Sequence, residues 1–434
     1  MITKEKWAEV IKEFYSQELP KTFERELKIP LEMPISRAVS IIGPRRAGKT
    51  YLMFNLIKKL LKKYPKENII YVNFEKASLL PLDSKDLVLL KDTFFELNPH
   101  LKKKDVWFFL DEIQNVDNWE LFIRTCLDEG IKVFISGSSS KLLSKEIATS
   151  MRGRTLTYTL LPFSFKEYIL SKNVKIQKFL SSSEKAEIIN LFNKYFGEGG
   201  YPETIIYPEQ SEKILSNIFE TALYKDVIER EKIRNTKVIL QLIKALISSK
   251  EFSVNKFYNY LKSLNVKVGK NALYNYVTYL EEAFVIFMLR KFDLSYKKAE
   301  QSLPKVYFID NGILTNNKID DKGRLLENLV FLELIRREKD VSYFQTSQNE
   351  EVDFLIKKGK KVNQLIQVCY DFSNFMTKDR ETKSLLKASE EFKCNNLLIL
   401  TNSQEEEIKL KGKKIIIKPV WKWLLESYGK TKNS

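Results

Sequence analysis

Gly43-Pro-Arg-Arg-Ala-Gly-Lys-Thr50 is the stretch that decides how the rest of this chain is interpreted. It follows an apolar run, Val39-Ser-Ile-Ile42, and it opens a segment whose apolar side chains recur at helical spacing. A strand, a glycine-containing loop and a helix in this order form a P-loop, whose backbone N–H groups and helix N-terminus bind phosphate oxygens. We therefore expect bound ATP to contact Gly43, Pro44, Arg45, Arg46, Ala47, Gly48, Lys49, Thr50 and Tyr51.

A second motif supports the first. The apolar run Val106-Trp-Phe-Phe-Leu110 is followed by Asp111 and Glu112. Within the P-loop, Lys49 is expected to contact the β and γ phosphates, and the hydroxyl of Thr50 to bind Mg²⁺. A buried strand that ends at Asp111 would place its carboxylate beside this ion, and Glu112 could then polarise the attacking water. The alternative is that both acids cap the next helix.

Short apolar runs alternate with helical patterns over the first third of the chain. An alternation of this kind predicts an α/β core with a parallel sheet. The expected strands are residues 38–42, 69–74, 106–110, 132–135 and 155–161.

Two polar segments follow these motifs in the sequence. Ser138 and Ser139 follow the fourth run, at the end of a strand expected between the P-loop strand and the acidic strand. Their hydroxyls could contact the γ-phosphate, or they could belong to an ordinary turn. Arg152 and Arg154 precede the fifth run. An arginine there could stabilise charge on a γ-phosphate, in cis or from a neighbouring subunit, or it could be a surface feature.

The composition limits the other possibilities. Lys and Arg number 73 against 56 Asp and Glu, a net charge of +17 that suggests DNA or another polyanion as a partner, or a solvated lysine-rich surface. The only histidine, His100, excludes chemistry that needs a histidine pair. Three cysteines without CxxC spacing argue for a reducing compartment. With no signal peptide or long apolar run, we expect a soluble cytoplasmic protein that does not enter a membrane.

In these motifs the chain resembles the archaeal and bacterial AAA+ ATPases that carry a C-terminal domain of unknown function. The resemblance rests on residues 43–50, 110–119, 136–143 and 151–168, and more weakly on 197–203 and 224–230. It implies that Ser138 or Ser139 is the sensor and that Arg152 or Arg154, with Arg154 favoured, is the arginine finger. It also implies an AAA+ fold, ATP and Mg²⁺ as cofactors, and no particular cellular role.

The second half suggests two further domains. Residues 252–261 and 270–282 resemble a helix–turn–helix, and 284–290 with 306–309 could be the strands of a wing. In a winged helix that binds DNA, the second of these helices would present Lys270, Asn271, Tyr274, Asn275 and Thr278 to the major groove. The alternative is a winged helix that only packs or contacts proteins.

The last segment resembles the PD-(D/E)XK nuclease fold. Glu327 and Asp353 match the helical and hairpin acids and form a weak second metal site. In the third motif, Gln367 and Cys369 stand where an acid and a lysine are required. Arg380 or Lys383 could replace the missing cation, but a degenerate binding domain is favoured over an active nuclease.

Together these patterns predict an α/β protein with an AAA+ P-loop NTPase core, a helical lid, a winged helix and a C-terminal α/β restriction-endonuclease-like domain. The function expected first is ATP hydrolysis coupled to DNA binding or processing. The alternatives are a nucleotide-gated switch that binds protein partners and a metal-dependent DNA nuclease, and self-association is also possible. The expected segments are an N-terminal helix and linker (1–35), the core (36–165), the lid (166–237), the winged helix (238–310) and the nuclease-like domain (311–434).

Overall fold

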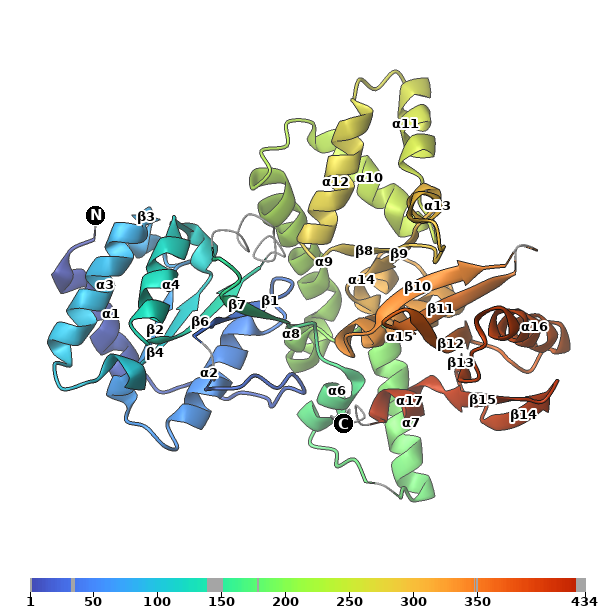
Figure 1. The fold of residues 1–434 in the computed structure, drawn as a ribbon, viewed down its shortest axis with the longest axis horizontal. Coiled ribbons are helices and arrows are strands. Elements are labelled where there is room, and N and C mark those ends of the chain that lie inside the picture. The colour runs from blue at the N-terminus through green and yellow to red at the C-terminus, as the bar shows by residue number, and fades with distance from the viewer. Residues whose placement is uncertain are drawn as a thin grey trace. The chain divides into compact units, whose positions relative to one another are not determined.

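The chain forms two compact units. A computed structural model describes residues 2–32, 36–138, 151–177, 179–346, 348 and 350–426. The first unit comprises residues 1–161 with 282–284, and the second comprises residues 162–281 with 285–434. Figure 1 shows the first unit in blue to teal and most of the second in green to red. Of the helices in the described ranges, none is both long and apolar enough to cross a membrane.

The first unit is built on a parallel sheet. Its strand order is β2-β4-β6-β1-β7, and every neighbouring pair is parallel. Strand β6 therefore lies between the P-loop strand β1 and the acidic strand β4, as the sequence predicted. The bounds are β1 Ala38–Ile42, β2 Ile69–Asn73, β4 Trp107–Asp111, β6 Lys132–Gly137 and β7 Thr155–Thr159. The short strands β3 (Leu82–Asp83) and β5 (Val116–Asp117) pair separately.

Helices cover both faces of this sheet. The side chains of β4 alternate between the two faces and contact helices on each. Phe109 stacks on Phe134 in a core that includes the apolar face of α2 (Lys49–Leu60). Phe108 faces the other way and contacts Phe94 of α3 and Phe122 of α4. The remaining bounds are α1 Lys4–Ser16, α3 Ser84–Leu97 and α4 Trp119–Asp128.

The second unit begins with the helices that the sequence predicted to form a lid. Phe165 and Phe192 from these helices share one buried cluster with Leu326 and Trp423 from the C-terminal part of the chain. Within this unit the helices at residues 166–237 therefore pack with the C-terminal domain and do not form a separate body. Their bounds are α6 Phe165–Ser171, α7 Ser182–Glu198, α8 Pro202–Ile206, α9 Ser211–Thr221 and the π-helix η7 Ala222–Glu229.

Three helices and a two-stranded hairpin follow. The helices are α10 (Thr236–Ser248), α11 (Val254–Ser263) and α12 (Lys270–Glu282), and β8 (Ile286–Leu289) pairs antiparallel with β9 (Lys305–Phe308). Helix α13 (Tyr296–Gln301) lies between these two strands in the sequence. This order of elements matches the expected arrangement, although its identity as a winged helix stays a prediction.

The C-terminal part is a mixed sheet between two helices. The strand order is β10-β11-β12-β13-β15-β14, with β12, β13 and β15 parallel to one another. Helix α15 packs with one face of the sheet and α16 with the other, as two separate buried clusters show. The bounds are α14 Asn311–Asn316, α15 Lys322–Arg336, β10 Asp340–Gln345, β11 Glu351–Lys358, β12 Lys361–Cys369, α16 Phe375–Phe392, β13 Leu397–Thr401, β14 Glu406–Leu410, β15 Lys413–Pro419 and α17 Val420–Leu425.

Candidate nucleotide site

The loop between β1 and α2 has the backbone conformation that its glycines allow. Gly48 precedes α2 with φ +95°, in the left-handed region that favours glycine. At Gly43, with φ +151°, an added Cβ would lie 2.1 Å from the carbonyl oxygen of Leu160. Any side chain at Gly43 would therefore collide with the segment that follows β7. The loop leads directly into the N-terminus of α2, where unpaired N–H groups favour anions.

Lys49, the first residue of α2, is buried at the base of this loop. Its Nζ donates hydrogen bonds of 3.1 Å to the carbonyl oxygens of both Gly43 and Pro44. The same ammonium lies 3.7 Å from the carboxylate of Glu112. The lysine and the second acid of the predicted pair are thus brought together.

Asp111 is the centre of a hydrogen-bond network at the carboxyl end of β4. Its Oδ2 accepts hydrogen bonds from the hydroxyls of Thr50, at 2.7 Å, and Tyr71, at 2.9 Å. Its Oδ1 accepts from the hydroxyl of Ser136. Burial, with the nearby Asp111 carboxylate, raises the pKa of Tyr71 far above its ordinary value, so this hydroxyl stays protonated and donates.

Glu112 is held in a defined position beside Asp111. Its backbone φ is +55°, which is uncommon for a residue other than glycine. The hydroxyl of Ser136 accepts from its N–H at 3.0 Å, and the side-chain amide of Gln114 donates to its carboxylate at 2.6 Å. Glu112 is therefore oriented by two neighbours and does not cap the following turn with its side chain.

Comparison with known proteins identifies the first unit. Residues 36–169 match the family described as an AAA domain, and residues 189–322 and 322–423 match two domains of unknown function, DUF8612 and DUF4143. The uncharacterized protein MJ1544 of Methanocaldococcus jannaschii is 42% identical over 427 residues, which cover 93% of this chain and 91% of that protein. The chain belongs to the same family of AAA-domain proteins. An uncharacterized protein of Haemophilus influenzae is 29% identical over 395 residues, covering 89% of this chain and 94% of that protein.

Solved structures are more distant. The ORC1 protein of Aeropyrum pernix in complex with DNA aligns with a TM-score of 0.32 at 10% identity, covering 72% of this chain and 90% of that one. The ORC2 protein of the same organism in its ADP form aligns with a TM-score of 0.34 at 15% identity, covering 66% of this chain and 88% of that one. Similarity at this level carries no information about what this chain binds.

The other residues of the P-loop segment that were expected to contact ATP differ in their exposure and in their hydrogen-bond partners. Arg45 forms a 2.6 Å ion pair with Glu75, and Tyr51 is exposed. The carbonyl oxygen of Ala47 accepts a 3.0 Å hydrogen bond from Arg25, whose guanidinium also donates to Leu161. Arg46 has a left-handed backbone, with φ +65°.

The sensor serine and the arginine finger were expected to contact the γ-phosphate, and these roles stay predictions. Ser138 is buried just after β6, and Ser139 lies outside the described residues. The serine that contacts Asp111 is Ser136, two residues earlier. The backbone oxygen of Arg154 accepts from Ala38, which places it at the amino end of β1, whereas the P-loop follows the carboxyl end. Its side chain pairs with Asp128, and Arg152 before it is exposed.

Sequence reasoning missed Tyr71, Ser136 and Gln114, although two of them had a signal. Tyr71 and Asn73 are half-buried polar residues at alternate positions of β2, an otherwise buried strand, so they share one face. Ser136 interrupts the apolar strand next to the acidic one. Polar side chains near the carboxyl ends of buried parallel strands are therefore a usable indicator of this network.

At the weak second metal site, the acids contact the ammonium of a lysine that the sequence analysis did not name. Glu327 and Asp353 lie close together, but both bind the ammonium of Lys305, at 2.8 and 3.0 Å. Lys305 was not considered in the sequence analysis, and the suggestion that Arg380 or Lys383 replaces the missing cation stays a prediction. Both follow the third motif on α16, where Arg380 donates to Glu381 and Lys383 pairs with Asp379 at 2.6 Å.

Proposed function

We propose that this AAA-domain protein hydrolyses ATP with Mg²⁺ at the site formed by the P-loop, Asp111 and Glu112. The observation that carries the proposal is the 2.7 Å hydrogen bond between Thr50 and Asp111, which joins the two motifs. A hydroxyl and a carboxylate are oxygen ligands of the kind that Mg²⁺ prefers. The fit to a nucleotide is supported by the glycine loop, which leaves its backbone open at the N-terminus of α2.

The protein's own residues would divide the work. Bound MgATP would supply the γ-phosphoryl group that a water molecule attacks. Lys49 would turn from the loop carbonyls toward phosphate oxygens, and Thr50 with Asp111 would hold the ion. Glu112 would accept a proton from the attacking water, with its carboxylate oriented by Gln114. Tyr71 and Ser136 would hold the Asp111 carboxylate in place through their hydrogen bonds to its two oxygens.

Turnover of ATP by the full-length protein tests this proposal. Hydrolysis that requires Mg²⁺ and disappears in Lys49→Ala would support it. A rate in Lys49→Ala equal to that of the wild type would overturn it. Tight retention of nucleotide with very slow turnover would instead favour a nucleotide-gated switch.

We further propose that hydrolysis is coupled to DNA binding by α10–α12 and the β8–β9 hairpin. The exposed face of α12 supports this. Leu273, Val277 and Leu280 of this helix are buried. The five side chains suggested for DNA contacts are all exposed on the remaining surface: Lys270, Asn271, Tyr274, Asn275 and Thr278. The net charge of +17 is of the sign that phosphate binding requires.

The test of this second part is the ATPase rate with and without duplex and branched DNA. Stimulation by DNA, together with binding that weakens as salt is added, would support coupling. An unchanged rate with any DNA and no salt-dependent binding would remove it and leave the ATPase proposal intact.

A further inference from the structure

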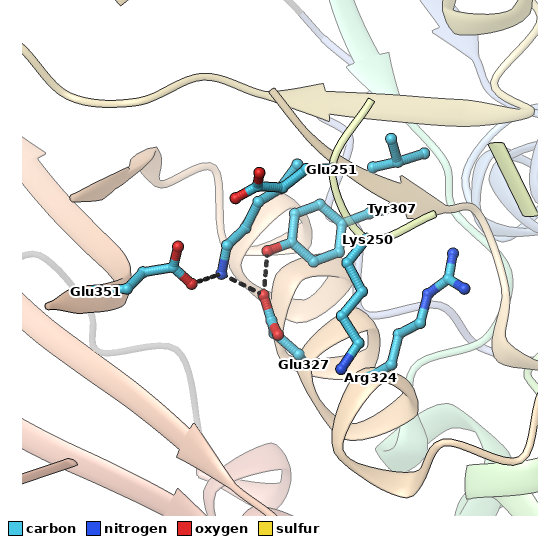
Figure 2. A pocket seen from close by; sticks show the side chains of 8 residues that line it. Lys250, Glu251, Tyr307, Arg324, Glu327 and Glu351 are labelled. Carbon is cyan, nitrogen blue, oxygen red and sulfur yellow. Dashed lines mark hydrogen bonds and ion pairs between the residues drawn. The ribbon is translucent and has the colours of Figure 1, made fainter. Parts of the chain in front are cut away.

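A cavity of about 440 Å³ in the second unit is lined by equal numbers of acidic and basic side chains. Figure 2 shows the carboxylate of Glu327 beside the hydroxyl of Tyr307, with the carboxylate of Glu351 turned toward the same point from the opposite side. The charged residues of the lining are Glu251, Glu327, Glu351, Lys250, Lys305 and Arg324.

The resemblance to PD-(D/E)XK nucleases implies a divalent cation at this position, held by Glu327 and Asp353. The surrounding residues do not fit such an ion. With Lys305 in place, the residues that the structure describes include no group of three or more His, Cys, Asp or Glu side chains arranged to hold a metal. The position of the third motif's acid is taken by Gln367, whose side-chain oxygen already accepts from the N–H of Asp353 at 3.1 Å.

Lys305 occupies the point on which the acids converge. Its ammonium forms ion pairs with Glu351 at 2.7 Å, Glu327 at 2.8 Å and Asp353 at 3.0 Å. The ammonium has three N–H donors. It donates hydrogen bonds to Glu327 and Asp353, and Glu351 pairs with the same charge. The side chain is 7% exposed, which keeps the positive charge among the carboxylates and away from water.

Each of the two motif acids also accepts a further hydrogen bond, on the same Oε1 atom in Glu327 and on the other oxygen in Asp353. Tyr307 donates to Glu327 at 2.6 Å, and the N–H of Val368 donates to Asp353 at 2.9 Å. Gln367 donates to the carbonyl oxygen of Glu351 at 3.1 Å and also to Glu381. A divalent ion would have to break several of these bonds and also displace a buried ammonium.

We propose that Lys305 is the built-in cation of this centre and that its ammonium excludes a divalent metal from Glu327, Glu351 and Asp353. Lys305 comes from β9, Glu327 from α15 and the other two acids from β11, so one ammonium joins three elements. The centre then fixes the β8–β9 hairpin to the C-terminal sheet. Metal-dependent DNA cleavage through Glu327 and Asp353 is not expected. This inference needs neither ATP nor DNA and is independent of the proposed function.

Binding of Mn²⁺ to the full-length protein without nucleotide, followed by electron paramagnetic resonance, tests the proposal. Wild type and Asp353→Asn should bind Mn²⁺ equally, since any ion at the P-loop is common to both. Lys305→Ala should gain one binding site, and adding Asp353→Asn to this variant should remove it. Lys298→Ala removes an exposed lysine of α13, between β8 and β9 in the sequence. It is the matched control and should gain no Mn²⁺ site.

Two results would overturn the proposal. One is a Mn²⁺ site in the wild type that Asp353→Asn or Glu327→Gln abolishes. The other is a folded Lys305→Ala that gains no site. If Lys305→Ala does not fold, the comparison of wild type with Asp353→Asn and Glu327→Gln decides the question by itself.

Discussion

The hydroxyl of Thr50, in the first turn of α2, donates a 2.7 Å hydrogen bond to Asp111 at the end of β4. These residues are separated by 61 positions, and the sheet order β4-β6-β1 brings them together. In the proposed function this pair would hold the magnesium ion, and Glu112 lies 3.7 Å from Lys49, the residue before Thr50. The first predictions concern this arrangement.

Glu112→Gln should keep ATP binding and stop hydrolysis. The amide has nearly the same shape but cannot accept a proton from water, so kcat should fall by about 10²-fold or more. Steady-state turnover and equilibrium binding of a fluorescent nucleotide measure the two effects separately. Asp117→Asn, an exposed acid of β5, makes the same chemical change away from the site and should be silent. Normal hydrolysis in Glu112→Gln would show that the catalytic assignment is wrong.

Tyr71→Phe should raise the Mg²⁺ concentration needed for half-maximal ATPase activity. The substitution removes one of the three hydroxyls that donate to Asp111. A hydrogen bond to a charged group contributes about 1.5–3 kcal/mol, so a shift on the order of tenfold is expected. The rate at saturating Mg²⁺ should change less. Tyr64→Phe, which removes an exposed hydroxyl bonded to Glu32, serves as control. An unchanged Mg²⁺ dependence would mean that Tyr71 does not position Asp111.

Four of the five core strands, β1, β2, β4 and β6, could be read from the sequence because they are short and largely apolar runs. Strands buried by helices on both faces lack the polar alternation of a surface sheet, whereas the edge strand β7 alternates Thr with Leu and Tyr and is half-buried. Asp111 and Lys49 followed from the same local patterns. What local patterns cannot give is which side chains meet across the fold. Lys305 binds Asp353 from 48 residues away, and nothing near either residue signals that pairing.

The boundaries of the second unit were harder to predict for a related reason. The helices at residues 166–237 have the amphipathic pattern of any packed helix, and a pattern does not name its partner. In the structure the apolar side of α7 contributes Phe192 to the cluster that also contains Trp423. Burial against a segment more than 200 positions away can be learned only from the three-dimensional fold.

The stability of the protein should respond to pH through Asp310. Burial raises the pKa of this carboxyl to about 7, although the N–H groups of Gly200 and Gly312 donate to it. A raised pKa means that the folded state binds more protons than the unfolded state between pH 3.8 and about 7. The contribution of Asp310 to the free energy of unfolding should therefore fall as the pH rises through this range.

Urea unfolding of the wild type and Asp310→Asn at several pH values isolates this contribution. The difference in unfolding free energy between the two proteins should change with pH between about 4 and 7 and be constant above that range. A difference that is the same at every pH would contradict the prediction. The glycines beside Asp310 make its surroundings tight, since a Cβ at Gly199 would lie 1.7 Å from the carboxylate.

Lys270→Glu in α12 should weaken DNA binding and reduce its salt dependence. Losing one phosphate contact lowers the slope of log K against log salt by about 1. Fluorescence anisotropy with a labelled duplex at several salt concentrations gives both affinity and slope. Lys409→Glu on β14 changes the net charge equally at another exposed position and should keep the slope. Equal effects of the two variants would show that only overall charge matters.

Arg154→Ala tests whether a neighbouring subunit completes the AAA site. In its own subunit Arg154 lies at the amino end of the strands and pairs with Asp128, so a catalytic role requires a second copy. If it acts as an arginine finger in trans, kcat should fall by about 10³-fold, while ATP binding by the isolated subunit is preserved. The specific activity of the wild type should then rise with protein concentration. Asp128→Ala breaks the same ion pair but leaves the arginine, so it should keep activity. Equal losses in Arg154→Ala and Asp128→Ala, or activity independent of concentration, would indicate that the pair is structural.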